Sequence, residues 1–200
     1  MSAPFITLLC WIIFILYWIV NWWRVKPAEE TTWRSPQSRW TIAWILILLF
    51  IIARSSLLPF FPSLNCPPYC QQDLFTPSFH LPFLQPIGVV VTIVGLIIAI
   101  IARKTLADNW SSNIELKKNH KLITTGIYKY ARHPIYTGIS VMGFGAILTL
   151  QAVMPILFFI SMFVFFLFKM NKEEALLTKH FPKEYTAYKK KTKALIPFIF

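Results

Sequence analysis

Hydrophobic residues of this chain gather into long apolar runs, and short stretches rich in lysine and arginine separate these runs. The runs fall at about 4–23, 40–53, 86–102 and 135–168, and the second continues to about 61 if it does not stop at Arg54. About 20 apolar residues are enough for a helix to cross a bilayer. The pattern predicts an all-α polytopic membrane protein with about five transmembrane helices, the last apolar run supplying two.

The run 135–168 contains no Asp, Glu, Lys or Arg over roughly 34 residues. This length is too great for one simple crossing and suits two short helices with a turn near 150–155. A helical hairpin brings both of its ends to the same membrane face. Arg132-His133 before it and Glu173-Glu174 after it are therefore predicted to lie close together. Ionisable groups gathered at a membrane boundary indicate a functional site.

Composition supports a membrane protein, since 56% of the residues are hydrophobic, 14% are charged, and 18 are phenylalanine. Such a chain is too apolar for an ordinary soluble domain. A net charge of +12 would suggest nucleic acid in a soluble protein. Here the charges are confined to loops, so topology explains them better and no nucleic-acid partner is expected.

The distribution of lysine and arginine predicts the orientation of the chain. The loops after the first and third runs and the C-terminal tail are strongly basic, whereas the loop after the second run carries only Arg54. The positive-inside rule then places the N-terminus outside and the C-terminus in the cytoplasm, as five crossings require. Residues 1–102 are predicted to be three transmembrane helices that form a scaffold and one wall of a substrate cavity. Residues 103–200 are predicted to be the catalytic region, with a cytoplasmic cofactor pocket between the 103–134 loop and the tail.

Cysteine and histidine give weaker signals. Cys66 and Cys70 lie in the predicted outer loop and could form a disulfide on an oxidising side. No metal site is expected, because His120, His133 and His180 lack ligand spacing and no cysteine lies near them.

Several local patterns predict backbone features of the polar segments. Residues 114–120 suit a short amphipathic or extended piece, and Gly126 suits a turn. Pro134 suits the first position of a helix. Residues 183–189 suit a helix with aromatic groups on one side and lysines on the other, lying on an anionic leaflet or presenting a solvated basic face.

The predicted cluster offers an imidazole, phenols, cations and a carboxylate from Glu173 or Glu174. A zwitterion fits these groups, with its carboxylate near a helix N-terminus and His133, its ammonium near Glu173, and a sulfonium against aromatic faces. Those are the parts of S-adenosylmethionine, although the same groups suit a phospholipid headgroup. Taken singly, Arg132 suits a membrane-surface anchor and Tyr136 an interfacial aromatic.

The C-terminal part of the chain resembles the isoprenylcysteine carboxyl methyltransferase family, within the wider phospholipid methyltransferase group. The resemblance covers roughly residues 113–197 and rests on the segments 122–128, 132–138, 173–174 and 181–185 together with Tyr188 and Pro197. The first hundred residues match only as a pattern of crossings.

This resemblance implies an integral-membrane methyltransferase that uses S-adenosyl-L-methionine and releases S-adenosyl-L-homocysteine. The implied catalytic residues are Lys169, Arg132 and Glu173. The residues implied to hold the cofactor are Asn113, His120, Lys121, Leu122, Ile123, Tyr128, His133, Pro134, Ile135, Tyr136 and Glu173. The implied mechanism is direct displacement at the methyl carbon, with a lipophilic or amphipathic acceptor entering from the bilayer and membrane lipids as neighbours.

Two positions depart from the family pattern. Lys169 stands where these enzymes usually have arginine, and Pro182 stands where they usually have glycine after Phe181. Lysine keeps the charge but loses the bidentate fork, which puts the prenylcysteine carboxylate in question as substrate. An NADPH-dependent oxidoreductase like the sterol reductases and a non-catalytic lipid-binding protein remain alternatives. The compact size suggests the plasma membrane of a prokaryote.

Overall fold

The computed structural model describes residues 2–22, 28–33, 46–47, 50, 53, 81–110, 114–117 and 121–195. Its helices are α1 (Ala3–Trp22), α3 (Leu84–Leu106), α4 (Pro134–Leu150), α5 (Val153–His180) and α6 (Pro182–Lys191). Short 3-10 turns occur at Ala107–Asn109 and Gly126–Lys129, and two strands at β1 (Ala28–Trp33) and β2 (Ile114–Lys117). The predicted crossing at 40–53 and the cysteine pair at 66 and 70 lie mostly or wholly outside the described residues.

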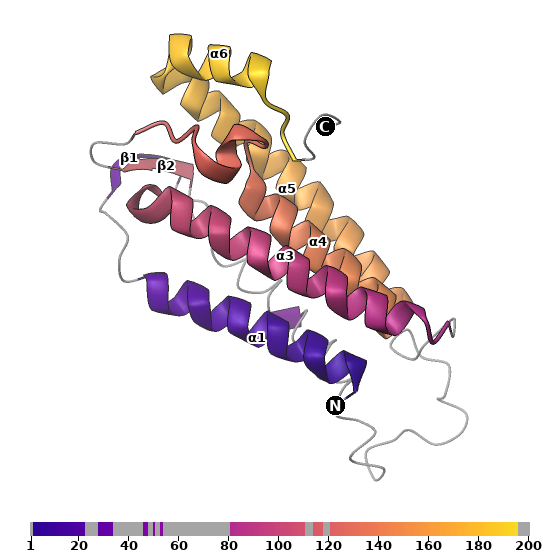
Figure 1. Ribbon diagram of the computed structural model, residues 1–200. Helices are drawn as coiled ribbons and strands as arrows, with labels where there is room; N and C mark the ends of the chain where they lie inside the picture. The colour runs from indigo at the N-terminus through magenta and orange to yellow at the C-terminus, as the bar shows by residue number, and fades with distance from the viewer. Residues whose placement is uncertain are drawn as a thin grey trace.

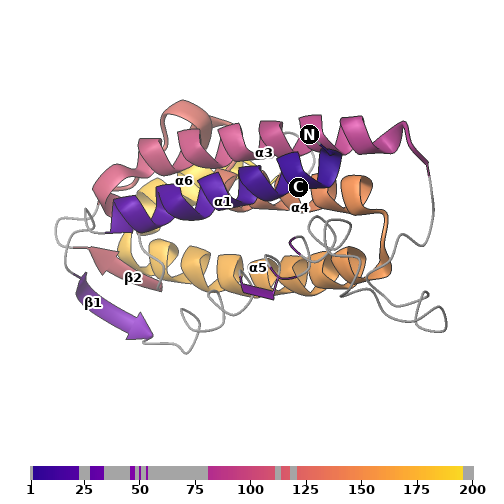
Figure 2. The same ribbon diagram turned by 90° about the horizontal axis from the view of Figure 1, so that it is seen from below.

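Four long helices lie side by side, and α6 lies across one end of them (Figures 1 and 2). Helices α1, α3 and α5 are each long and apolar enough to cross a membrane, and α4 is a shorter apolar helix. Thr7 at the start of α1 donates to Thr149 at the end of α4, with 3.3 Å between their hydroxyl oxygens. Helix α4 therefore runs opposite to α1. The hairpin predicted within 135–168 is present, with its turn at Gln151 and Ala152.

Helices α3 and α4 pack with their backbones in close contact, because glycines face the partner helix on both sides. A Cβ on Gly88 would lie 2.6 Å from the carbonyl oxygen of Gly145, and one on Gly95 would lie 2.5 Å from the backbone nitrogen of Met142. A Cβ on Gly138 would lie 2.6 Å from the backbone nitrogen of Ala99 on α3. Small residues allow this approach in membranes, where backbone proximity and van der Waals contact drive helix association. The spacing of seven residues within each glycine pair is a sequence signal that our reading of the pattern missed.

The turn between α4 and α5 is fixed by one buried polar side chain. Gln151 adopts a left-handed conformation with φ of 55° and is fully buried. Its amide accepts from the backbone N–H of Leu81 at 3.0 Å and donates to the carbonyl of Leu81 at 2.7 Å. Both hydrogen bonds replace water for groups that are partly or wholly buried. The hairpin turn is thereby attached to the residues that precede α3.

Arg103 closes the other end of the bundle. It is buried on α3, and its guanidinium donates to the carbonyls of Ala107 at 2.6 Å and Asn21 at 3.2 Å. The same group lies 4.6 Å from the centre of the Trp110 ring. Since α1 and α3 both end here, the two helices run in the same direction. In the sequence this arginine reads only as one of many topology-setting charges.

The structure also contains a two-stranded β-ribbon, which the all-α prediction did not include. Strand β1 pairs antiparallel with β2, so the segment after α1 lies beside the segment after α3. The extended alternative predicted for part of 114–120 is therefore confirmed at Ile114–Lys117. The ribbon places the segment after α1 and the segment after α3 at the same end of the bundle. Which face is cytoplasmic stays a prediction.

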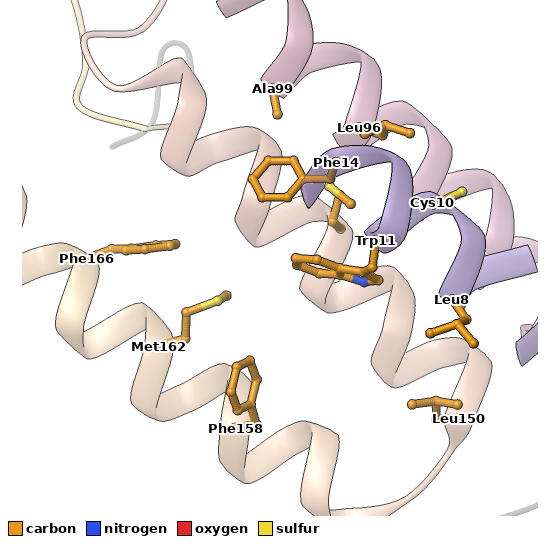
Figure 3. Close-up of a cluster of buried hydrophobic side chains, with 11 residues drawn as sticks. Leu8, Cys10, Trp11, Phe14, Leu96, Ala99, Leu150, Phe158, Met162 and Phe166 are labelled. Carbon is orange, nitrogen blue, oxygen red and sulfur yellow. The ribbon is translucent and has the colours of Figure 1, made fainter. Parts of the chain in front are cut away.

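The apolar core lies between α1, α3, α4 and α5. Trp11 and Phe14 of α1 lie opposite Phe158, Met162 and Phe166 of α5 (Figure 3), and all five are buried. The α5 residues recur every four positions and so form one face of the helix. The same face continues toward the polar end of α5, where the candidate site begins.

Candidate functional site

The candidate site lies beside the first residues of α4, where the apolar part of α5 ends and its polar part begins. Pro134 is the first residue of α4, and His133 is the residue that precedes the helix. Helix α5 returns alongside α4 and brings Glu173 and Glu174 level with His133 and Tyr136. The predicted meeting of the Arg-His pair with the acidic pair is confirmed.

Glu173 is the more accessible of the two glutamates, with 23% of its side chain exposed. The Tyr136 hydroxyl donates to its Oε1 at 2.6 Å, and the His133 Nδ1 lies 3.5 Å from its Oε2. Two donors therefore hold this carboxylate in place while part of it stays open to a ligand.

Glu174 is enclosed by basic groups, and only 9% of its side chain is exposed. Arg132 Nε lies 2.7 Å from its Oε1, and His133 Nε2 lies 3.3 Å from the same oxygen. Lys189 Nζ, from α6, lies 2.6 Å from its Oε2. From the sequence, Glu174 was an alternative to Glu173 as the carboxylate of the site, and no pattern connected Lys189 with either glutamate.

His133 bridges the two carboxylates through its two ring nitrogens. Burial lowers the pKa of this imidazole, but hydrogen bonds and charge from Glu173 and Glu174 outweigh burial, so its pKa is raised above the ordinary value. The charged form donates from both nitrogens, which matches an acceptor on either side.

Aromatic rings and a buried cation continue the site along the two helices. The rings of His133 and Tyr136 stack with centres 5.7 Å apart, and those of Tyr136 and Phe166 stack at 4.8 Å. Lys169 is 7% exposed, and its Nζ lies 5.6 Å from the centre of the Tyr136 ring. The side of Tyr136 that faces α5 is therefore both aromatic and cationic, at the edge of the apolar core.

The C-terminal tail is bound to the segment before α4. The backbone N–H groups of Arg132 and His133 donate to the carbonyls of Lys193 and Ala194, each at 2.9 Å. The Tyr188 hydroxyl donates to the carbonyl of Tyr128 at 2.6 Å. Burial raises the pKa of Tyr188 to about 12 and also raises the pKa of Tyr128, so both phenols stay neutral near pH 7. The predicted approach of the 103–134 loop to the tail is present in residues 128–133.

Arg132 is a structural link in this arrangement as well as a charge. Besides its ion pair with Glu174, its guanidinium donates to the backbone carbonyls of Thr192 and Lys189. It therefore connects the start of α4, the end of α5 and the tail. A catalytic role for Arg132 stays a prediction.

The remaining predicted cofactor residues occupy different surroundings. Ile123 packs against a cluster of buried residues that includes Tyr128 and Ile135, whereas Pro134 is buried at the start of α4. Lys121 is exposed, and its N–H donates to Asn109 Oδ1 at 3.4 Å. Leu122 lines an open surface cavity of about 530 Å³, whose other lining residues are Thr124, Lys129, Glu184, Ala187, Tyr188, Lys191 and Thr192. The predicted residues Asn113 and His120 lie outside the described part of the chain.

Comparison with known proteins agrees with the resemblance read from the sequence. Residues 87–179 match the model of the isoprenylcysteine carboxyl methyltransferase family. The protein-S-isoprenylcysteine O-methyltransferase of Saccharomyces cerevisiae is 31% identical over 129 residues, which cover 63% of this chain and 54% of the yeast protein. The enzyme of that name from Schizosaccharomyces pombe is 39% identical over 83 residues, or 41% of this chain and 35% of that protein. The predicted resemblance is therefore confirmed, and the chain spans about half the length of the S. cerevisiae relative.

A solved structure has a similar fold. It is that of the eukaryotic intramembrane Ras methyltransferase, an isoprenylcysteine carboxyl methyltransferase, with a TM-score of 0.55 and 22% sequence identity. The match covers 84% of this chain and 70% of that one. This likeness supports a polytopic helical membrane fold for the chain.

Proposed function

We propose that this chain is an S-adenosylmethionine-dependent membrane methyltransferase whose acceptor is a lipophilic molecule with a terminal carboxylate. Isoprenylcysteine is the acceptor class that the names of its relatives indicate. The observation that carries the proposal is the grouping of His133, Tyr136, Lys169 and Glu173 at the polar end of the apolar core. These residues lie within the segment that matches the family model.

The residues present suit the parts of S-adenosylmethionine. The partly open carboxylate of Glu173 suits an ammonium group, and the stacked rings of Tyr136 and Phe166 suit a sulfonium cation. The amine of Lys169 suits a carboxylate. When bound, the cofactor supplies a methyl group on a positively charged sulfur.

The protein's own contribution would be orientation and exclusion of water. Tyr136 fixes Glu173 through a 2.6 Å hydrogen bond, and His133 holds the other oxygen of the same carboxylate. Groups held in this way lose little freedom when a ligand binds, which is how positioning accelerates displacement reactions. A displacement at the methyl carbon needs no protein nucleophile, and Cys10, the one cysteine within the described residues, is buried in α1 far along the chain from this cluster.

Lys169 is the residue most suited to orient an anionic acceptor. It is buried near the Tyr136 ring, at the junction of the apolar core and the polar site. A lipophilic acceptor with a carboxylate end matches this junction, since its chain would remain in the bilayer. Lysine offers a point charge instead of the fork of arginine, so we expect less strict orientation of a carboxylate.

The second departure from the family pattern leaves the tail well formed. Pro182 is the first residue of α6, where the absent N–H would have had no helical partner. Tyr185 and Tyr188 on the same helix remain buried against the site. Proline at this position is therefore compatible with a bound cofactor.

The experiment has two arms, both with purified protein in detergent. Isothermal titration calorimetry with S-adenosylhomocysteine measures the affinity of the cofactor site. Transfer of a labelled methyl group to N-acetyl-S-farnesylcysteine measures turnover of the acceptor. We expect binding that Glu173→Gln and His133→Ala both weaken at least tenfold, and turnover that Lys169→Met reduces more than Lys169→Arg.

No binding to folded wild-type protein would refute the proposal. Oxidation of NADPH in the presence of a sterol would then favour a reductase. Binding without transfer to the farnesylated acceptor or to dispersed phospholipid would instead favour a non-catalytic role. Orientation of the site toward the cytoplasm and a prokaryotic membrane stay predictions, to be tested by cysteine accessibility in oriented vesicles and by the source of the chain.

A further inference from the structure

We propose that Glu174 is a positioning residue that fixes the His133 ring relative to Glu173 and couples this geometry to the docking of α6. The proposal rests on the proposed function only in its binding consequence. Glu173, with its partly open carboxylate, is the residue that would contact the ligand. Glu174 would instead hold the side chains that surround Glu173 in place.

The first argument comes from the partners of the two carboxylates. Tyr136 and His133 occupy the two oxygens of Glu173, while Arg132, His133 and Lys189 occupy those of Glu174. Every carboxylate oxygen therefore has a donor nearby. Because His133 is held at Nδ1 by one glutamate and at Nε2 by the other, its ring cannot rotate without losing both contacts.

The second argument comes from charge and burial. His133 and the side chains of Arg132 and Glu174 are each less than one tenth exposed. Neutralising Glu174 would leave the buried Arg132 guanidinium and the His133 imidazole without the negative charge that they share. Buried charges that lose a partner are strongly disfavoured, so the imidazole would lose its proton more readily. It would then have one hydrogen to donate and could no longer donate to both side chains.

The third argument concerns α6. Lys189 is 53% exposed, yet its Nζ lies 2.6 Å from Glu174 Oε2. The neighbouring Lys190 has the same charge and is also exposed, but among the residues that the structure describes Lys189 is the lysine that pairs with Glu174. The ion pair of Lys189 with Glu174 therefore links the position of α6 to that of the Glu174 carboxylate. The backbone bonds from Arg132 and His133 to the residues after α6 reinforce the same docking.

Titratable and charged groups surround the His133–Glu174 pair on each packed element. They are Glu173 and Lys169 on α5, Tyr136 on α4, Arg132 before it, Tyr128 in the preceding turn, and Tyr185, Tyr188 and Lys189 on α6. The phenols are neutral near pH 7, so the pair is influenced chiefly by the two glutamates and the three cations.

The test compares wild type with Glu174→Gln, Glu174→Asp, Lys189→Met and the matched control Lys190→Met, all in detergent. The first readout is the ¹⁵N-histidine NMR titration of His133, assigned by its absence in His133→Gln. The second is the dissociation constant for S-adenosylhomocysteine at pH 6 and pH 8. Thermal unfolding of each variant identifies loss of fold.

We expect Glu174→Gln to lower the titration midpoint of His133 and to weaken binding roughly ten- to hundredfold, as the loss of charged hydrogen bonds does. Glu174→Asp should recover part of both. Lys189→Met should weaken binding roughly two- to fivefold, as expected for a half-exposed ion pair, and Lys190→Met should not.

An unchanged His133 titration in folded Glu174→Gln would overturn the proposal. So would equal effects of Lys189→Met and Lys190→Met on the titration. If Glu174→Gln does not fold, the Lys189 and Lys190 pair decides. Failure of wild type to bind S-adenosylhomocysteine would refute the proposed function, whereas the histidine titration would still decide whether Glu174 positions His133.

Discussion

The contact between α3 and α4 gives the sharpest structural prediction, because the two nearest atoms that a Cβ at Gly95 would meet both belong to the backbone of α4. A Cβ placed there would lie 2.5 Å from the backbone nitrogen of Met142 and 2.7 Å from the carbonyl oxygen of Gly138. Ordinary contacts begin near 3.4 Å, so Gly95→Ala requires the helices to separate by about 0.9 Å at this point. Neither backbone atom can move alone.

Gly143→Ala on α4 is the matched control. A Cβ there would meet ring and methyl carbons of Phe159 and Met162 at 2.9 and 3.3 Å, and these side chains can shift. Both substitutions gain the same helix propensity, about 1 kcal/mol, so this term cancels in the comparison. Overpacking costs about 1–3 kcal/mol. We therefore expect Gly95→Ala to be less stable than Gly143→Ala by about this amount.

Thermal unfolding in detergent measures the difference. About 2–4 °C per kcal/mol is typical for a chain of this size, which gives a gap of roughly 2–12 °C. Separation of α3 and α4 would also displace the start of α4, and with it Tyr136, so binding of S-adenosylhomocysteine should weaken in Gly95→Ala alone. Equal melting temperatures for the two variants would refute close backbone packing as the basis of this interface.

Three further predictions concern hydrogen bonds and pH. Tyr136→Phe removes a 2.6 Å hydrogen bond to the Glu173 carboxylate. It should weaken S-adenosylhomocysteine binding roughly tenfold or more in a titration, since a hydrogen bond to a charged group is worth about 1.5–3 kcal/mol. Unchanged binding would show that Glu173 needs no such support. The raised pKa of His133 means that its stabilisation is complete below its ordinary pKa and is lost as pH rises through the raised value. The melting temperature should therefore fall over that interval, and His133→Gln should lose this part of the pH dependence in scanning fluorimetry. Gln151→Ala removes two bonds to backbone and should cost about 1–3 kcal/mol without changing ligand affinity, which unfolding and titration together would check.

The sequence by itself determined the long apolar helices α1, α3 and α5, the hairpin and the meeting of its two polar ends. These follow from the length of apolar runs and from the positions of charges, which are one-dimensional properties read against the thickness of a bilayer. The start of α4 at Pro134 follows from local chemistry in the same way.

The tertiary structure alone decided which groups face one another within that meeting. Glu173 and Glu174 are neighbours in sequence and point about 100° apart on a helix, so the rotation of α5 against α4 and α6 determines which is open. The same rotation brings Glu174 within ion-pair distance of Arg132 and Lys189. Contacts of this kind join residues 40 to 60 positions apart, and no local pattern of hydrophobicity or charge contains them. The sequence therefore located the site, whereas helix packing assigned its members.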